Sequence, residues 1–278
     1  MIVDWSKPTG QLKVGGRSLE WGVFGPAPAD CERPVIVMLH EGLGCLALWR
    51  DFPEQLAQAT GHPVFAYSRA GYGQSDADDL PRPLTYMTRE AISVLPEILG
   101  AISAEGLILM GHSDGATIAA IYAGKVFDLR LRGLIAIAPH FFAEPMGLAE
   151  IADAKVMFET TDMKDRMAKY HRDPEATFRG WNDAWLDPGF EAWNVEDALD
   201  MLRVPTLAVQ GADDQYGTLA QVRAIKERSP ESVDLVVLDG CRHSPHVDRP
   251  EATLAVVTDF VTRLEASKTN EEFKTNEA

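Results

Sequence analysis

Short apolar runs alternate with longer segments of mixed polarity along most of this chain. Each run is bounded by Gly, Pro or charged residues, which is the pattern of strands buried on both faces of a sheet. The predicted strands are residues 35–39, 64–67, 107–110, 134–138, 206–210 and 235–238. A hairpin of two further strands, residues 11–14 and 19–24, is expected to turn at Gly15 and Gly16.

Segments with apolar positions at helical spacing lie between the predicted strands. They are residues 48–60, 86–99, 116–126, 219–228 and 251–264. Alternation of strands and helices is typical of a parallel sheet covered on both faces. The sequence therefore predicts an α/β fold with a mostly parallel, eight-stranded sheet and helices on both faces.

The alternation stops between about Phe141 and Trp193. This stretch contains no convincing strand, but it has helix-like segments and three tryptophans, and it is too long for an ordinary connection. We therefore expect an α/β core formed by residues 1–140 and 195–265, a helical cap inserted at residues 141–194, and a flexible polar tail at residues 266–278.

Composition narrows the class of protein. The chain has 278 residues, of which 46% are hydrophobic and 24% charged, as is ordinary for a globular protein. The formal net charge of −16 repels phosphate backbones and anionic lipids, so neither nucleic acid nor membrane is an expected partner. The expected partner is a small-molecule substrate, and the sequence leaves open whether the chain forms a homo-oligomer.

Three features predict a cytoplasmic protein. No stretch approaches the roughly 20 consecutive apolar residues of a membrane span, and the N-terminus lacks the build of a signal peptide. Cys31, Cys45 and Cys241 are odd in number and lack metal-ligand spacing, which favours reduced thiols. No motif indicates a metal or cofactor, so none is expected.

Ser113 is the first candidate for chemistry. It lies in Gly-His-Ser-Asp-Gly at residues 111–115, directly after a predicted strand and before a predicted helix. In such a G-x-S-x-G turn the serine backbone is strained and the hydroxyl projects from the sheet, which requires glycine on both sides. The alternative is an ordinary helix N-terminus capped by Ser or Asp.

A serine nucleophile needs a base, and the base needs an orienting group. Asp214 follows the strand at 206–210 and is preferred over Asp213 as that group, although such aspartates also shape turns. His243 follows the last predicted strand and is preferred over His246 as the base. Each group follows a different strand, in the chain order Ser, Asp, His, which favours a catalytic triad.

The oxyanion that forms on the substrate needs hydrogen-bond donors. One candidate is the backbone N–H of Asp114, directly after the serine. A second is expected from the loop His40-Glu41-Gly42-Leu43-Gly44, which follows the strand at 35–39. Its glycines let the backbone approach a substrate closely. Alone the loop would be taken as an ordinary turn, but beside the other groups it favours catalysis.

With these motifs the chain resembles the α/β-hydrolase superfamily, in its capped esterase, lactonase and C–C hydrolase branch. The resemblance covers about residues 12–264. It includes residues 40–49, similar to the family's His-Gly oxyanion loop and following tryptophan, residues 68–75, similar to its Arg-x-Gly-x-Gly-x-Ser loop, and residues 240–246, similar to its turn before the catalytic histidine. A serine nucleophile implies attack on a carbonyl rather than the alkyl-enzyme route of the superfamily's aspartate enzymes.

Three positions depart from the family pattern. Glu41 replaces the glycine that usually follows the histidine, so alignment gives the oxyanion position to Gly42, with Leu43 as the alternative in a shifted loop. Ser68 replaces an aspartate, and Asp114 places a carboxylate beside the expected oxyanion. We hypothesise that Glu41 and Asp114 are held by hydrogen bonds at the pocket rim and tune substrate choice.

The cap and the nearby strand ends supply candidates for substrate contact. Trp181 and Trp185 are expected to line an apolar pocket, and His140 to face it from a strand end. Glu41 and Leu43 are the corresponding candidates in the oxyanion loop. The alternative for the cap aromatics is packing within the cap, which is expected for most of them.

The sequence thus predicts a cofactor-free serine hydrolase of small carboxylic esters or lactones, working through an acyl-enzyme on Ser113. Two alternatives stay open: a C–C bond hydrolase of a ring-fission diketone with the same triad, and a ligand receptor in which the triad is vestigial. Acyl transfer and amide cleavage would use the same groups, and substrate identity depends on the shape of the pocket.

Overall fold

The computed structural model describes residues 2–276, with side chains to residue 266. Eight strands form one sheet in the order β1-β2-β4-β3-β5-β6-β7-β8. The β1–β2 and β2–β4 pairs are antiparallel and the others are parallel, which confirms the predicted mostly parallel, eight-stranded sheet. The strands are β1 Thr9–Val14, β2 Arg17–Phe24, β3 Val35–Leu39, β4 Val64–Tyr67, β5 Leu107–His112, β6 Leu131–Ile137, β7 Thr206–Gly211 and β8 Val233–Leu238.

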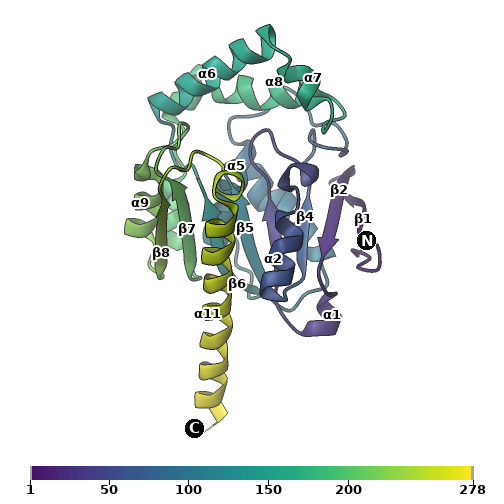
Figure 1. Ribbon diagram of the computed structural model, residues 1–278, viewed down its shortest axis with the longest axis vertical. Helices are drawn as coiled ribbons and strands as arrows, with labels where there is room; N and C mark the ends of the chain where they lie inside the picture. Colours follow the sequence, from purple (N-terminus) through teal and green to yellow (C-terminus); the bar gives the residue numbers. More distant parts are fainter. Residues whose placement is uncertain (1, 277–278) are drawn as a thin grey trace.

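Helices cover both faces of the sheet (Figure 1), as predicted. Side chains alternate between the faces of a strand, so Val35 and Val37 of β3 join one buried cluster while Ile36 and Met38 join the other. The second cluster includes α2 (Phe52–Thr60) and α11 (Pro250–Asn276). The first includes α3 (Tyr86–Arg89), η2 (Glu90–Val94), α4 (Leu95–Ala101), α5 (Asp114–Lys125), η4 (Glu196–Met201) and α9 (Leu219–Arg228).

Most predicted elements begin or end a few residues away from their predicted bounds, and two of these differences have a clear cause in the backbone. The helix predicted at 48–60 is interrupted, because η1 (Leu46–Trp49) ends before Arg50, whose φ of 55° cannot continue a right-handed helix, and α2 begins only at Phe52. The strand predicted at 134–138 begins earlier, at Leu131, and ends at Ile137 because Ala138 has a φ of 45°. The short helices α1 (Pro28–Cys31) and α10 (Pro245–Asp248) were not predicted.

The segment predicted as a cap contains helices α6, α7 and α8, which lie together beyond one end of the sheet (Figure 1). An antiparallel bridge between Phe142 and Asn194 closes the segment at its base. Aromatic pairs pack its interior, with ring centroids 4.0 Å apart for Phe158 and Phe178. The bounds are α6 Pro145–Thr160, α7 Met163–Met167, α8 Pro174–Trp185 and η3 Pro188–Ala192.

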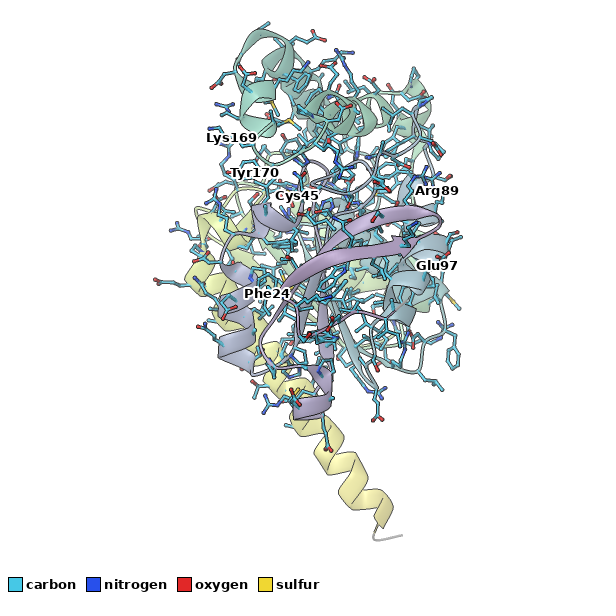
Figure 2. All side chains as sticks on the ribbon, turned by 90° about the vertical axis from the view of Figure 1, so that its right-hand side faces the viewer. Phe24, Cys45, Arg89, Glu97, Lys169 and Tyr170 are labelled. Carbon is cyan, nitrogen blue, oxygen red and sulfur yellow. The ribbon has the colours of Figure 1, made fainter. Side chains whose placement is uncertain are left out.

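The last helix extends into the segment that was predicted as a flexible C-terminal tail. α11 continues to Asn276, and its final turns project away from the sheet at the end opposite the cap (Figures 1 and 2). Residues 266–276 are therefore helical, whereas a flexible tail was predicted for 266–278; residues 277 and 278 lie outside the described part. Lys and Glu each occur twice in this segment and are good helix formers. Within residues 2–276, no helix has the length and apolarity needed to cross a bilayer.

Candidate active site

Ser113 occupies the sharp turn between β5 and α5. Its backbone has a φ of 53° and a ψ of −120°, in a region that residues other than glycine rarely adopt. A Cβ on Gly111 would lie 2.2 Å from the carbonyl oxygen of Gly115, and a Cβ on Gly115 would lie 2.1 Å from that of Leu39. Close backbone packing therefore requires both glycines of the motif, and the strain at Ser113 is of the kind found at functional sites.

His243 and Asp214 meet beyond the ends of β8 and β7. The imidazole Nδ1 lies 2.9 Å from Asp214 Oδ1 and 2.8 Å from Oδ2, so Nδ1–H donates to the carboxylate. The side chain of Asp214 is 1% exposed and that of His243 is 12% exposed. With Nδ1 protonated, a neutral ring presents Nε2 as a proton acceptor.

Asp214 is oriented by its own strand and the following turn. Gln210 Nε2 donates to Oδ2 at 2.6 Å, and the backbone N–H groups of Tyr216 and Gly217 donate to Oδ1 at 2.8 and 3.3 Å. Burial opposes ionisation of this carboxyl, but the hydrogen bond from His243 and that from the Tyr216 N–H outweigh it and lower the pKa of Asp214. The carboxylate is thus held ionised behind the imidazole.

The competing candidates for carboxylate and base lie elsewhere. Asp213 is exposed, and His246 is buried with its ring centroid 4.8 Å from that of Trp49. Burial lowers the pKa of His246 to about 3. His140 is also buried, its ring centroid is 5.5 Å from that of His243, and burial lowers its pKa to about 3. Both of these histidines are therefore neutral near pH 7.

Ser113 and His243 line one cavity of about 100 Å³. Within the described residues, neither the Ser113 hydroxyl nor His243 Nε2 has a hydrogen-bond partner. Hydrogen bonds of this kind often tighten only when substrate is bound. The remaining lining residues are Glu41, Gly42, Leu43, Asp114, His140, Ile151, Trp181, Trp185 and Tyr216. All residues that the sequence assigned to catalysis or substrate contact line this cavity except Asp214, which lies behind His243.

The loop after β3 is held in place by Arg69. The guanidinium donates to the backbone carbonyls of His40 and Glu41, the latter at 3.0 Å, and His40 Nδ1 donates to the Glu41 carbonyl at 2.7 Å. A trans peptide directs its C=O and N–H to opposite sides, so the Gly42 N–H points away from Arg69. Within residues 2–276, the N–H groups of Gly42 and Asp114 donate to no acceptor. Both are available to an oxyanion in the cavity that these residues line.

The cap contacts the same loop directly. A Cβ on Gly42 would lie 2.3 Å from Trp181 Nε1, so any larger residue would have to displace Trp181 or the loop. His171 donates from Nε2 to the Leu43 carbonyl at 3.1 Å, and its Nδ1 accepts the N–H of Gly73 at 3.0 Å. Figure 2 labels the preceding cap residue, Tyr170, on the same side of the molecule as Cys45, which ends this loop. The segment predicted as a cap therefore contacts the loop after β3 through both Trp181 and His171.

A second carboxylate–imidazole pair adjoins the first. His112 Nδ1 lies 3.4 Å from Glu41 Oε2, and His112 Nε2 lies 2.7 Å from the backbone oxygen of His243. The partner of Nε2 is a carbonyl oxygen, so Nε2–H donates to it, and when the ring is protonated Nδ1–H also donates to Glu41. Burial opposes this charge, but the hydrogen bond and charge of Glu41 outweigh it and raise the pKa of His112. Burial likewise opposes the charge of Glu41, and His112 holds the pKa of Glu41 far below its usual range.

Asp114 also lines the cavity and is 1% exposed. Its Oδ2 accepts from the Tyr86 hydroxyl at 2.5 Å, and the Tyr86 oxygen accepts from Trp185 Nε1 at 3.0 Å. Burial raises the pKa of Asp114, against the opposing effect of the Arg69 charge. The hydrogen-bonded chain joins the residue after Ser113 to the cap.

Sequence reasoning did not assign a role to five residues of this site: Arg69, Tyr86, His112, Ile151 and Tyr216. His112 could have been predicted as a site residue, because it lies between the glycine and the serine of the G-x-S-x-G motif. Arg69 was noted only as part of a motif. Tyr86 on α3 and Ile151 on α6 carry no signal in the sequence, since only the packing of those helices brings Tyr86 against Asp114 and Ile151 to the cavity.

A family model described as "Alpha/beta hydrolase family" matches residues 36–256. The chain belongs to this family. A curated relative of this α/β-hydrolase, "Putative esterase/lipase 2" of Mycoplasma genitalium, is 23% identical over 222 residues, which are 74% of this chain and 81% of that protein.

Two solved structures share the fold of this α/β-hydrolase. The enol-lactonase of Burkholderia xenovorans LB400 has a TM-score of 0.71 at 19% identity and covers 91% of this chain and 100% of that chain. A structure from work on carboxylesterases of the thaumarchaeon Nitrososphaera gargenis has a TM-score of 0.74 at 18% identity, covering 94% and 100%. Among the described residues of this α/β-hydrolase, no group of three or more His, Cys, Asp or Glu side chains is placed to hold a metal ion.

Proposed function

We propose that this α/β-hydrolase is a serine hydrolase that cleaves small carboxylic esters or lactones through an acyl-enzyme on Ser113. One observation carries the proposal. A serine at positive φ shares a cavity with His243, whose Nδ1 donates to the buried carboxylate of Asp214. These side chains supply the nucleophile, the base and the orienting group that the proposed acyl transfer requires.

In the proposed reaction Ser113 Oγ attacks the substrate carbonyl while His243 Nε2 accepts the hydroxyl proton. Asp214 stabilises the imidazolium, and the N–H groups of Gly42 and Asp114 donate to the oxyanion. His243 then protonates the departing oxygen, which leaves an acyl-enzyme. Water attacks the acyl carbon with His243 again as the base, the carboxylic acid departs, and Ser113 regains its proton.

The size and lining of the cavity support a small substrate. Its volume of about 100 Å³ is below the roughly 300–1,000 Å³ of pockets for drug-sized ligands. Ile151, Trp181 and Trp185 give it apolar walls on the cap side. The names of the relatives, an esterase/lipase and an enol-lactonase, support the two bond types proposed.

The test combines covalent labelling with a substrate panel. A serine-directed fluorophosphonate is expected to label the wild type and Ser103→Ala, in which an exposed serine is removed, but not Ser113→Ala. Values of kcat/KM for p-nitrophenyl acetate, a small lactone and a ring-fission diketone are then compared. Hydrolysis of the ester or lactone that is lost in Ser113→Ala is the expected result.

Other outcomes of the same panel would reject the proposal. Preference for the diketone over both other substrates would indicate a C–C bond hydrolase. Slow turnover of every substrate with tight binding of one would indicate a ligand receptor. Labelling or hydrolysis that persists in Ser113→Ala would show that Ser113 is not the nucleophile.

A further inference from the structure

Asp114 is a buried carboxylate without a cationic partner. It is 1% exposed, and its only side-chain hydrogen bond within the described residues joins Oδ2 to the neutral hydroxyl of Tyr86. Oδ1 therefore accepts no hydrogen bond there. Buried charges are ordinarily paired, and an exception calls for an explanation.

The nearest guanidinium groups are committed elsewhere. Arg69 donates to the backbone carbonyls of His40 and Glu41. Arg82 donates to the Tyr72 hydroxyl and pairs with Asp78 at 3.2 Å. Neither forms an ion pair with Asp114 within 4.0 Å. The two arginines favour ionisation of Asp114 at longer range without occupying its carboxylate.

The cavity that Asp114 lines is unbalanced in charge. Its described lining contains two carboxylates, Asp114 and Glu41, and neither lysine nor arginine. The Glu41 side chain is 27% exposed, and only its Oε2 is hydrogen-bonded, to His112. His112 compensates the charge of Glu41, so Asp114 is the carboxylate left for a ligand.

We propose that this cavity selects substrates whose acyl group carries a primary or secondary ammonium close to the scissile carbonyl, with the Asp114 carboxylate as the partner of that cation. The proposal rests on the serine hydrolase function proposed above and adds the chemical class of its substrate: aminoacyl esters rather than neutral or anionic acyl esters.

The covalent structure of Asp114 sets where the ammonium would lie. The backbone N–H of Asp114 is a proposed oxyanion donor, and its carboxylate is only a few bonds from that nitrogen. A cation paired with Oδ1 is therefore expected near the acyl carbon, as in an α-amino acid ester. A carboxylate beside the oxyanion is unfavourable when empty, and a bound ammonium neutralises it.

Burial raises the pKa of Asp114, and a bound cation would stabilise its charged form and lower that pKa again. Charge-assisted hydrogen bonds contribute more than neutral ones. An ammonium that satisfies Oδ1 should therefore bind better than a methyl group of the same size, which would leave the carboxylate oxygen unpaired.

The test uses three methyl esters of nearly equal size. L-alanine methyl ester carries an ammonium, methyl lactate a hydroxyl, and methyl isobutyrate a methyl group at the same position. At about pH 7, below the usual α-amino pKa of about 7.7–8.0, kcat/KM for the alanine ester is expected to exceed that for the isobutyrate by about 10- to 100-fold. Methyl lactate should lie near the isobutyrate.

Variants assign the preference to one side chain. Asp114→Asn keeps the backbone N–H and the side-chain shape, and the ratio of alanine to isobutyrate kcat/KM is expected to fall about tenfold or more. Taking the ratio within each variant cancels any change in the oxyanion site. Asp183→Asn removes an equal charge from a 51% exposed position on α8 and should leave the ratio unchanged.

Several results would overturn the inference. These are equal kcat/KM for the alanine and isobutyrate esters, equal preference for lactate, which would indicate a neutral donor, or an unchanged ratio in Asp114→Asn. An enzyme that reacts with fluorophosphonate, but neither cleaves the alanine ester nor is protected by it from labelling, also overturns it while leaving the serine hydrolase intact. Loss of fluorophosphonate labelling altogether would instead count against the proposed function.

Discussion

The Asp214–His243 and Glu41–His112 pairs consist of the same kinds of side chain, and their two imidazole ring centroids are 5.1 Å apart. They differ in what the second ring nitrogen contacts. His243 Nε2 has no partner within the described residues and its ring lines the cavity, whereas His112 Nε2 donates to the His243 backbone oxygen. A carboxylate beside an imidazole is therefore not enough to make a base, because the far nitrogen must also be free.

The second pair joins three loops of the site. Glu41 precedes Gly42 of the oxyanion loop, His112 precedes Ser113, and the His112 ring holds the loop of His243. A Cβ on Gly44 would lie 2.3 Å from Glu41 Oε2, so glycine leaves room for this carboxylate. We interpret Glu41 and His112 as positioning residues, and the variants below compare them with the proposed triad.

The largest difference in kcat is expected between variants of the two histidines, His243 and His112. His243→Gln removes the proposed base and should lower kcat for a p-nitrophenyl ester by roughly 10⁴- to 10⁶-fold. His112→Asn should lower it by about tenfold, through loss of positioning alone. Comparable losses in the two variants, with both folded by circular dichroism, would contradict the assignment of roles.

Substitution of the two carboxylates should also lower kcat unequally, with the larger loss at Asp214. Asp214→Asn leaves the shape of the pair intact but no longer fixes the tautomer of His243, and kcat should fall by roughly 10³- to 10⁴-fold. Glu41→Gln, which is equally isosteric, should cost about tenfold or less. A Glu41→Gln enzyme as impaired as Asp214→Asn would show that the second pair takes part in proton transfer.

The oxyanion loop offers a further test. Gly42→Ala places a methyl group against Trp181 and should lower kcat by about 10- to 100-fold, because the N–H at this position is displaced. Gly100→Ala in α4 is the matched control, since a Cβ there meets no atom within 4 Å. Full activity in Gly42→Ala would place the second oxyanion donor elsewhere, with Leu43 as the next candidate.

The smallest predicted effect concerns stability and pH. Because the pKa of His112 is raised in the folded protein, its stabilising charge is fully present below the unfolded pKa of about 6.5 and is lost as pH rises through the folded value. The free energy of unfolding of wild type minus that of His112→Asn should therefore fall as the pH rises above about 6.5. Urea titrations at each pH measure it, and a difference that stays constant or rises would contradict the raised pKa of His112.

Most of the fold could be predicted from the sequence, because the patterns that indicate its strands and turns are local. Runs such as 35–39 and 107–110 are apolar on both faces. Gly111 and Gly115 of the G-x-S-x-G motif are required by close backbone packing at one turn. The break at Arg50 was missed although Pro53, which favours the first turn of a helix, lies inside the predicted segment. The helical continuation of α11 was missed because the prediction rested on composition alone.

Beyond the three residues of the proposed triad, less of the candidate site could be predicted from the sequence. The positions of Asp214 and His243 follow from strand order, since parallel strands end at one edge. The link from Asp114 through Tyr86 to Trp185 depends on how α3 and α8 pack, and no pattern in the chain encodes that approach. The raised pKa of His112 likewise depends on the approach of Glu41, which no pattern in the chain encodes.

The most direct test of the central claim is the position of the acyl group. Rapid acid quenching of the enzyme during turnover of a p-nitrophenyl ester, followed by peptide mass spectrometry, should find one acyl group per chain on Ser113. An acyl group on another residue, or one found equally in Ser113→Ala, would contradict the account.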